Sequence, residues 1–287
     1  MTTAAQIEAP SARTLLAGAA TALSAVSSTP RLDAELLLAF AAGTRRSSIV
    51  AFAEREVEGP AAARFRAAIT RRARGEPLAY ITGRKEFFSI GLDVTPAVLI
   101  PRPETELLVE EVLERFEQAS ACSVLDLGTG SGALALAIKK HLPNADVWAA
   151  DASNEALAVA RGNALHLGFD VRFVQSDWFA AFAGRRFDAI VCNPPYVCAG
   201  DPALDGELAF EPRLALDGGA DGLQAVRALL AHALPHLRGD GLLLLEHGYD
   251  QRTAVLDLAS AVGFEALATR RDLAGHDRMA VLRSTRS

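Results

Sequence analysis

Residues 123–132 read Ser-Val-Leu-Asp-Leu-Gly-Thr-Gly-Ser-Gly, an apolar strand pattern that runs directly into a cluster of glycines. Glycines in such a turn let the chain bend sharply and let a ligand approach the backbone, with the N-terminus of a helix just behind. The apolar pattern from Ala133 to His141 predicts that helix. The segment therefore predicts the first strand, turn and helix of a parallel sheet. Its candidate binding loop consists of Gly128, Thr129, Gly130, Ser131 and Gly132.

The same alternation of strands and helices continues downstream. Strands are predicted at 123–127, 146–151, 171–175, 187–192, 242–246, 264–270 and 278–283, and helices at 133–141, 154–167, 222–237 and 250–262. Alternation of this kind specifies a parallel sheet with helices on both faces. A loop too short for a crossover helix joins the last two strands, so these two should pair antiparallel. We therefore expect an α/β fold with a seven-stranded, Rossmann-like sheet.

The first part of the chain has a different pattern. Helical spacing of apolar residues over 11–25, 30–43 and 61–74 predicts a small bundle of about four helices. From Glu86 the pattern changes to a period of two, which predicts a hairpin at 87–94. We expect a helical domain at 1–84, a hairpin and linker at 85–104, and a larger α/β domain at 105–287.

Charge and composition set limits on the partners. Residues 1–85 contain 12 Lys and Arg and 7 Asp and Glu, so this part is basic. Residues 86–287 contain 17 Lys and Arg and 28 Asp and Glu, so this part is acidic, and the whole chain has a net charge of −6. Neither part carries the dense basic stripe of a duplex-DNA-binding protein. No apolar run approaches the ~20 residues that span a bilayer, and the first residues do not form a signal peptide. Cys122, Cys192 and Cys198 lack disulfide or metal-site spacing, so we expect reduced packing cysteines in a cytoplasmic protein.

Two further residues at the same edge of the predicted sheet point to a nucleoside. Asp151 ends the second predicted strand, nineteen residues after the last glycine of the loop. An acidic residue there can accept both ribose hydroxyls of an adenosine. Trp178 follows the third strand and is placed to stack on an adenine. This combination fits either a dinucleotide or S-adenosylmethionine. Asp126 is interpreted instead as a structural carboxylate that accepts hydrogen bonds from the N–H groups of the loop.

The fourth predicted strand ends in a stiff corner, Asn193-Pro194-Pro195-Tyr196. Prolines cannot donate to a sheet ladder, and each one forces extended geometry on the residue before it. The corner offers the side-chain amide of Asn193, the carbonyl of Pro194 and the flat ring of Tyr196. Such a set suits a planar nitrogen that carries hydrogens.

An adenosine cofactor beside this corner predicts methyl transfer to a planar NH2 nitrogen. The lone pair of that nitrogen is delocalised, and its N–H bonds polarise as it attacks and gains positive charge. Fixed acceptors aimed at its hydrogens therefore bind the transition state more tightly than the ground state. Asn193 and Pro194 are the candidate catalytic acceptors, and Tyr196 holds the flat group by stacking. No general base is required, and these residues alone do not choose between glutamine and adenine.

Two other groups of residues are less informative. Arg102, Glu104 and Thr105 stand at a predicted helix N-terminus, where they would receive an anionic group or cap the helix. The sequence does not decide whether these three residues touch the cofactor. His232 and His236 are four residues apart on a helix but lack a third ligand, so no metal site is expected.

Six segments of the chain form a distinctive set. They are Gly-Glu-Pro-Leu-Ala-Tyr-Ile at 75–81, Glu-Phe-Phe at 86–88, Leu-Ile-Pro-Arg-Pro-Glu-Thr-Glu at 99–106, Asp-Leu-Gly-Thr-Gly-Ser-Gly at 126–132, Asn-Pro-Pro-Tyr at 193–196 and Glu-Pro-Arg-Leu-Ala-Leu-Asp-Gly-Gly at 211–219. The set resembles the peptide chain release factor N5-glutamine methyltransferase family (PrmC, also called HemK), and the resemblance spans residues 70–283. Asn-Pro-Pro-Tyr alone is shared with adenine and cytosine amino-methyltransferases, whereas the 99–106 segment is far more specific.

The resemblance implies a fold, a reaction and a substrate. The fold is the class I S-adenosylmethionine-dependent methyltransferase sheet with a small N-terminal helical bundle, and residues 105–287 would form the methyltransferase domain. The reaction moves a methyl group from S-adenosylmethionine to the side-chain amide nitrogen (N5) of the glutamine in the Gly-Gly-Gln motif of class-one peptide chain release factors. The helical domain would help to recognise the release factor.

The resemblance also assigns site residues. The cofactor would be contacted by Gly128, Thr129, Gly130, Ser131, Gly132, Asp151, Trp178 and Asn193, and the glutamine would be framed by Asn193, Pro194, Pro195 and Tyr196. We expect a cytoplasmic monomer with no metal and no duplex-DNA or membrane partner. The alternative is an adenine-N6 nucleic-acid methyltransferase, which the acidic C-terminal part and the lack of an added basic domain disfavour. A regulator that binds the nucleoside and transfers nothing is a third hypothesis.

Overall fold

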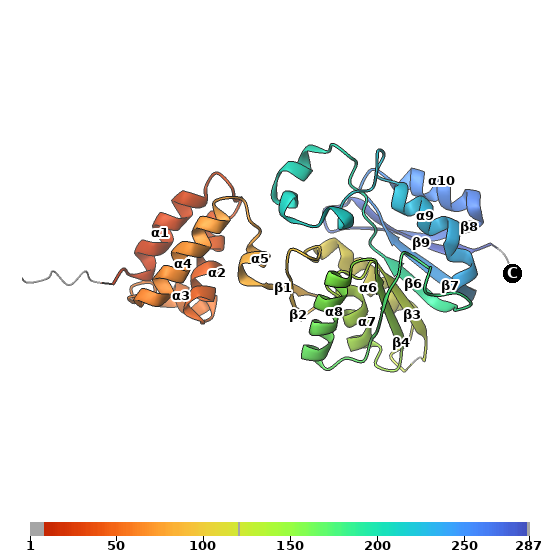
Figure 1. The fold of residues 1–287 in the computed structure, drawn as a ribbon, viewed down its shortest axis with the longest axis horizontal. Coiled ribbons are helices and arrows are strands. Elements are labelled where there is room, and N and C mark those ends of the chain that lie inside the picture. The colour runs from red at the N-terminus through yellow and green to blue at the C-terminus, as the bar shows by residue number, and fades with distance from the viewer. Residues whose placement is uncertain (1–8, 120, 286–287) are drawn as a thin grey trace, which may run out of the picture. The chain divides into compact units, whose positions relative to one another are not determined.

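The computed structural model describes residues 9–119 and 121–285 of the chain (Figure 1). The chain divides into two compact units, with bounds Met1–Gly83 and Arg84–Ser287. The described part of the first unit is helical, and the second unit contains two sheets and the remaining helices. The segment expected as a hairpin and linker at 85–104 belongs to the second unit.

The first unit is a bundle of short helices. These are α1 (Ala12–Leu23), α2 (Pro30–Ala42), α3 (Arg46–Ala51), α4 (Gly59–Arg72) and α5 (Leu78–Thr82). Local signals set their ends. Ser11 caps α1, because its Oγ accepts a hydrogen bond from the Thr14 N–H at 3.3 Å. Gly43 ends α2 in the left-handed conformation at a φ of +61°. Leu16 and Phe65 lie in the buried core of the bundle.

The second unit is organised around a seven-stranded sheet with the order β5-β4-β3-β6-β7-β9-β8. The strands are β3 (Ser123–Leu127), β4 (Asp146–Asp151), β5 (Arg172–Gln175), β6 (Phe187–Cys192), β7 (Leu237–Glu246), β8 (Phe264–Arg271) and β9 (Asp277–Ser284). The first five strands in this order are parallel, and β9 runs antiparallel to both β7 and β8. The predicted α/β fold with a seven-stranded sheet and an antiparallel final pair is therefore confirmed.

Helices cover both faces of this sheet (Figure 1). One core receives side chains from α6 (Glu106–Arg115), α7 (Ala133–His141) and α8 (Asn154–Leu167), and the other from α9 (Gln224–Ala233) and α10 (Arg252–Val262). Successive side chains of β3 enter the two cores in turn, since Val124 belongs to one and Leu125 and Leu127 to the other. Burial on both faces explains why the parallel strands read as nearly continuous apolar runs.

Strand β7 differs from its prediction, which placed it at 242–246. It begins at Leu237, which pairs with Phe187, and regular pairing resumes at Leu242 after an irregularity. The three residues after Leu237 are Arg-Gly-Asp and are exposed. Because these residues are polar or lack a side chain, the apolar pattern did not reveal the start of the strand.

A separate hairpin precedes the main sheet. Its strands β1 (Arg84–Phe87) and β2 (Ile90–Asp93) pair antiparallel, close to the predicted position. The Phe88 N–H, in the turn of this hairpin, donates to Glu106 Oε1 at 2.8 Å. The hairpin is therefore tied to the start of α6, where the 3₁₀ turn η1 (Pro103–Thr105) leads into the helix.

The described part of the chain contains neither a membrane-spanning helix nor a metal-binding cluster. None of its helices has the length and apolar character needed to span a membrane. Nor do three or more His, Cys, Asp or Glu side chains gather there in a way that could hold a metal ion.

Candidate active site

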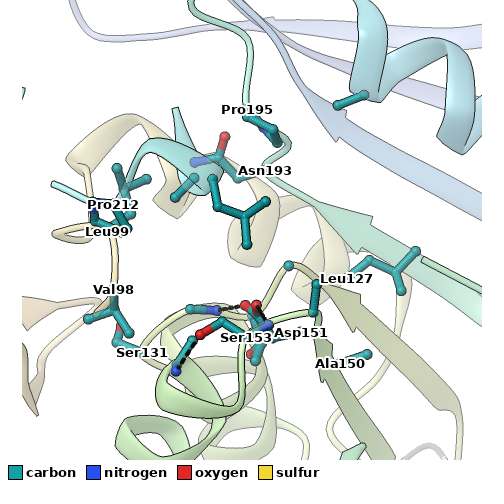
Figure 2. Close-up of a pocket in the computed structure, with 18 of the residues that line it drawn as sticks. Val98, Leu99, Leu127, Ser131, Ala150, Asp151, Ser153, Asn193, Pro195 and Pro212 are labelled. Atoms are coloured by element: carbon teal, nitrogen blue, oxygen red, sulfur yellow. Dashed lines mark hydrogen bonds between the residues drawn. The ribbon is translucent and has the colours of Figure 1, made fainter. Parts of the chain in front are cut away.

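A cavity of about 900 Å³ lies at the carboxyl ends of the parallel strands. Loops after β3, β4, β5 and β6 form part of its wall, together with residues between 97 and 105 and between 212 and 219 and the first residues of α9, between 224 and 228. Figure 2 shows Asn193 and Pro195 on one side of this cavity and Asp151 on the other. The strand order turns here, because β4 lies on one side of β3 and β6 on the other. Ligands bind at such a point in open α/β sheets.

The glycine loop after β3 has open space in front of it. Gly128 and Gly130 have φ values of +71° and +55°, and a Cβ at either position would have no atom within 4 Å. This geometry requires glycine and leaves the backbone accessible to a ligand. Gly132 is not among the described residues that line the cavity. A Cβ on Gly132 would lie 3.0 Å from Leu136 Cδ1 and 3.3 Å from Ala160 Cβ, so this glycine lets α7 and α8 pack closely.

Asp151, at the end of β4, is held in one position at the cavity wall. Its Oδ2 accepts the Gly130 N–H at 2.9 Å, and its Oδ1 accepts the Ser153 N–H at 2.9 Å (Figure 2). Ser153 also caps α8, because its Oγ accepts the Ala156 N–H at 3.1 Å. The carboxylate is thus oriented by the glycine loop and by the helix start, and each oxygen keeps a lone pair for a ligand hydroxyl.

Asp126 lies in β3 and is fully buried. Its Oδ2 accepts hydrogen bonds from Thr129 Oγ1 at 2.6 Å and from the Ala135 N–H at 3.2 Å, whereas Oδ1 is buried without a partner among the described residues. Burial raises the pKa of Asp126 to about 7. The contacts join the glycine loop to the first turn of α7, so Asp126 has a structural role, but the expected donors were wrong: they are a loop hydroxyl and a helix N–H, not N–H groups of the loop.

Trp178 lines the cavity in a strained backbone conformation. Its φ of +45° lies in a region that bulky residues rarely adopt, at a cost on the order of 1–3 kcal/mol. Ser176 supports the turn, since its Oγ donates to the Trp178 carbonyl at 2.7 Å and accepts the Ala181 N–H at 3.1 Å. Strain of this kind is concentrated at ligand-binding sites, so Trp178 stays our candidate for the adenine contact.

The proline corner after β6 places Asn193 and Pro195 at the cavity wall. The Asn193 Nδ2 donates to Thr105 Oγ1 at 3.1 Å, and Thr105 also lines the cavity. No described residue donates a hydrogen bond to the Asn193 amide oxygen. Pro194 is buried, and neither Pro194 nor Tyr196 is among the described lining residues. The corner therefore offers one uncommitted amide oxygen at the wall.

The Tyr196 hydroxyl has a partner in the protein, Glu246 Oε1, to which it donates at 3.2 Å. Glu246 ends β7 and is only 1% exposed. Burial raises the pKa of Glu246 to about 7, against the lowering effect of hydrogen bonds from Thr105 and Tyr196. Burial also raises the pKa of Tyr196. Glu246 could not be recognised from the sequence, because one acidic residue after an apolar strand forms no local motif.

The backbone of the corner is clamped by Gln251 and by a glycine-rich loop. Gln251 Nε2 donates to the Tyr196 carbonyl at 3.1 Å and to the Gly222 carbonyl at 3.2 Å. A Cβ on Gly222 would lie 2.4 Å from the Tyr196 carbonyl oxygen, and a Cβ on Gly218 would lie 2.8 Å from Tyr196 Cα. The corner thus leaves no space for side chains at these two glycines.

Glu211 joins two segments of the cavity wall and was not singled out by itself in the sequence. Its buried carboxylate accepts the Ile100 N–H at 2.9 Å and forms an ion pair with Arg102. Arg102 and Thr105 line the cavity, whereas Glu104 is not among the described lining residues. Glu211 therefore holds the two motif segments that contain residues 99–106 and 211–219 against each other.

Comparison with known sequences finds relatives over most of the chain. Residues 14–83 match a family model described as the PrmC N-terminal domain, and residues 103–205 match one described as the methyltransferase small domain. The release factor glutamine methyltransferase of Burkholderia pseudomallei is 48% identical over 255 residues, which cover 86% of this chain and 90% of that protein. The same enzyme of Moorella thermoacetica is 50% identical over 253 residues, covering 87% and 89%. That of Escherichia coli is 41% identical over 255 residues, covering 88% and 92%.

Solved methyltransferase structures share the fold. A methyltransferase of Pyrococcus furiosus matches 75% of this chain and 96% of its own, with a TM-score of 0.52 and 20% identity. The 16S rRNA methyltransferase RsmC of T. thermophilus, solved in complex with AdoMet and guanosine, matches 71% of this chain and 50% of its own, with a TM-score of 0.50 and 20% identity. At these identities the likeness establishes the fold alone.

Proposed function

This chain belongs to the release factor glutamine methyltransferase family, and we propose that it methylates the side-chain amide nitrogen (N5) of the glutamine in the Gly-Gly-Gln motif of class-one peptide chain release factors. It is an S-adenosylmethionine-dependent methyltransferase. The observation that carries the proposal is the placement of Asn193. Its amide oxygen is uncommitted at the wall of the cavity that also contains the glycine loop and Asp151.

The cavity fits S-adenosylmethionine, which supplies a methyl group on a positively charged sulfur when it is bound. The open space in front of Gly128 and Gly130 allows close approach to the backbone. Asp151, whose two oxygens are oriented by backbone N–H groups, is placed to accept the ribose hydroxyls. Trp178 provides an aromatic wall for the adenine. We assign Thr129 and Ser131, which also line the cavity, to the same cofactor site.

Asn193 is assigned to the reacting amide of the glutamine. As the amide nitrogen gains its methyl group it also gains positive charge, and its N–H bonds become stronger donors. An acceptor that is already in place stabilises this charge more than it stabilises the ground state. We assign the second acceptor to the Pro194 carbonyl, and the planar contact to Pro195 and Tyr196. The product nitrogen is acidic enough to lose its proton to water, so no base is assigned.

The first unit is assigned to recognition of the release factor. The match of residues 14–83 to the PrmC N-terminal domain supports this role. Leu32 and Phe40 on α2 are 38% and 51% exposed and so are available for contact with a partner. We propose that the enzyme acts as a cytoplasmic monomer.

The proposed function is tested by incubating the full chain with methyl-labelled S-adenosylmethionine and a purified class-one release factor. Mass spectrometry of the digested release factor should place one methyl group on the glutamine of the Gly-Gly-Gln motif. A release factor with Glu in place of that glutamine keeps the shape, lacks the amide nitrogen, and should stay unmethylated. Duplex DNA is incubated in parallel. Methyl groups on adenine of the DNA and none on the release factor would favour the alternative function and contradict the proposal.

A further inference from the structure

The wall of the cavity has two sides with different residues. The segments after β3, β4 and β5, which include Asp151, form the side that we assign to the cofactor. The other side, which we call the substrate side, consists mainly of residues 97–105, the proline corner and residues 212–219. Figure 2 shows Pro212 on the same side of the cavity as Asn193. The polypeptide that carries the target glutamine to Asn193 therefore has to approach along the substrate side.

Few charged groups lie on the substrate side. The cations among its described lining residues are Arg102 and Arg213. Arg102 is committed to the buried carboxylate of Glu211, with which it forms an ion pair. The carboxylate of Asp217 accepts the Gly219 N–H at 2.9 Å. Arg213 is exposed, and its guanidinium forms no hydrogen bond or ion pair with any described residue. It is therefore the one cation of this side that is free to bind a ligand.

The turn that carries this arginine is held in place on both sides. It is η4 (Arg213–Ala215), whose first carbonyl accepts the Asp217 N–H at 2.9 Å. Before the turn, Glu211 anchors the chain, because its carboxylate accepts the Ile100 N–H at 2.9 Å. After the turn, Asp217 forms an isolated parallel bridge with Val197, the residue that follows the proline corner. A side chain on a backbone that is already ordered loses less entropy when it binds.

The next residue of the turn is apolar and exposed. Leu214 is 65% exposed and lines the cavity, and none of the other large exposed apolar side chains of the described chain does so. A bound polypeptide that covers this side chain would remove apolar surface from water, which is favourable. Arg213 and Leu214 thus offer hydrogen-bond donors and an apolar surface at adjacent positions of the wall.

The substrate offers matching groups beside its glutamine. In the Gly-Gly-Gln motif two glycines precede the target residue, and glycines leave the backbone open to close approach because they have no side chain. The backbone carbonyl oxygens of such a segment are strong hydrogen-bond acceptors. A guanidinium presents five N–H donors in a rigid planar fork and accepts no hydrogen bond. It can therefore bind two neighbouring carbonyl oxygens at once.

We propose that Arg213 and Leu214 are specificity-determining residues that hold the substrate backbone beside the target glutamine. Arg213 donates to the carbonyl oxygens of the two glycines, and Leu214 makes an apolar contact with the same stretch of chain. The inference rests on the proposed function and deepens it, because it names the part of the release factor that the second unit binds. Neither residue contacts the reacting nitrogen, so both act on binding of the substrate and not on methyl transfer.

Two substitutions of exposed side chains test the proposal. Arg213→Gln removes the charged fork, and Leu214→Ser removes the apolar surface. Each should raise KM for the release factor about tenfold, the effect of losing one such contact. The kcat at saturating release factor should stay unchanged, because a contact outside the reacting group is the same in the ground state and the transition state. An unchanged KM in either variant, or a loss of kcat in place of the rise in KM, would overturn the proposal.

Matched controls come from the same unit. Arg186 is exposed and Leu165 is 85% exposed, and neither is among the described lining residues. Arg186→Gln and Leu165→Ser should therefore leave KM for the release factor unchanged, and a rise in KM equal to that of the test variants would contradict the assignment. Thermal melting should give the wild-type Tm for all four variants, since each changes an exposed side chain.

Binding of S-adenosylhomocysteine distinguishes the substrate from the cofactor as the partner of Arg213. The amino-acid part of this cofactor product carries a carboxylate, which an unpaired guanidinium could also bind. Calorimetry with Arg213→Gln should give the wild-type Kd for S-adenosylhomocysteine. A Kd weakened about tenfold would assign Arg213 to the cofactor and overturn the proposal.

The salt dependence distinguishes backbone carbonyls from an acidic side chain of the release factor. An exposed ion pair is screened strongly between about 0.1 M and about 1 M salt, whereas a hydrogen bond to an uncharged carbonyl is affected less. The ratio of KM between Arg213→Gln and the wild-type chain should therefore persist at high salt, and its disappearance would overturn the backbone assignment. Failure of the proposed function is distinguishable, because then the wild-type chain would not methylate the release factor at all.

Discussion

At the scale of single residues, Asn193→Ala tests the chemistry most directly. The variant should fold and bind the cofactor, because the side chain lies at a cavity wall and makes one hydrogen bond, to Thr105. Turnover should fall by about 10²–10³, as for other preorganised polar groups that contact a reacting atom. Single-turnover methylation of the release factor measures this loss. An unchanged rate would remove Asn193 from the catalytic role.

Asp151→Ala should weaken binding of S-adenosylhomocysteine by about 1.5–3 kcal/mol, the range for hydrogen bonds to a charged group. The expected loss follows from a carboxylate whose two oxygens are already oriented by the Gly130 and Ser153 N–H groups. Isothermal calorimetry measures it. Asp170→Ala is the matched control, since Asp170 is exposed and is not among the described lining residues. Equal affinities of the two variants would exclude Asp151 from the ribose site.

Glu246→Gln should change the pH dependence of stability. Burial raises the pKa of Glu246 from 4.5 to about 7 in the folded chain. As the pH rises from 4.5 to about 7, the Glu246 carboxyl loses its proton in the unfolded chain but keeps it in the folded chain. The free energy of unfolding therefore falls over this range, by about 3 kcal/mol in all. The glutamine cannot ionise and avoids this loss. Calorimetry should therefore give a higher Tm for the variant at about pH 8 and nearly equal values at about pH 4. A wild-type chain that is more stable at both pH values would refute this explanation.

The residues that the sequence identified are those in local motifs. Asp151 and the glycine loop follow strands at positions that a parallel sheet brings to one edge, and the proline corner can be read from adjacent residues. Asn193 and Thr105 share a hydrogen bond but lie 88 positions apart in the sequence. Their contact depends on the packed fold, and no local pattern predicts it. The same holds for the positive φ of Trp178.

At the scale of elements, periodicity located most helices and strands, and the exceptions have physical causes. Helices at 133–141 and 154–167 have the predicted bounds, because a glycine precedes the first and Ser153 and Gly168 cap the second. Strand β7 was predicted too short, since its first residues are polar or glycine and are exposed at a point of irregular pairing.

The glycine-rich loop against the proline corner gives a prediction for an element. Gly222→Ala would place a Cβ 2.4 Å from the Tyr196 carbonyl oxygen, so either the loop or the corner must move. The variant should lose about 1–3 kcal/mol of stability and lose activity as the corner shifts. Gly184→Ala is the control, because Gly184 has a similar φ of +73° with nothing within 4 Å of its Cβ. Denaturant unfolding separates the two variants. Equal stability and activity would show that the loop does not support the corner.

At the scale of the whole molecule, the two units should separate cofactor binding from substrate recognition. The described residues that line the cavity all lie between 97 and 228, within the second unit. A chain of residues 84–287 should therefore bind S-adenosylhomocysteine with the affinity of the full chain. Its kcat/KM for the release factor should fall about tenfold or more, because contacts to the partner are lost. An unchanged kcat/KM would show that the first unit does not contribute to recognition.

The fold class could be predicted for the whole second unit, but the order of its strands could not. Alternating strands and helices required a parallel sheet, and the short last connection required an antiparallel pair. The pairing of β3 with β6 joins residues 65 positions apart and places the switch point, and with it the cavity, beside the proline corner. That pairing results from long-range packing, which the local pattern does not contain.

The close approach of Gly222 to the Tyr196 carbonyl has a consequence for descent. A side chain at position 222 would displace the proline corner, so lineages that keep the corner should keep glycine at 222. A lineage that has lost this glycine should also have changed the residues of the corner.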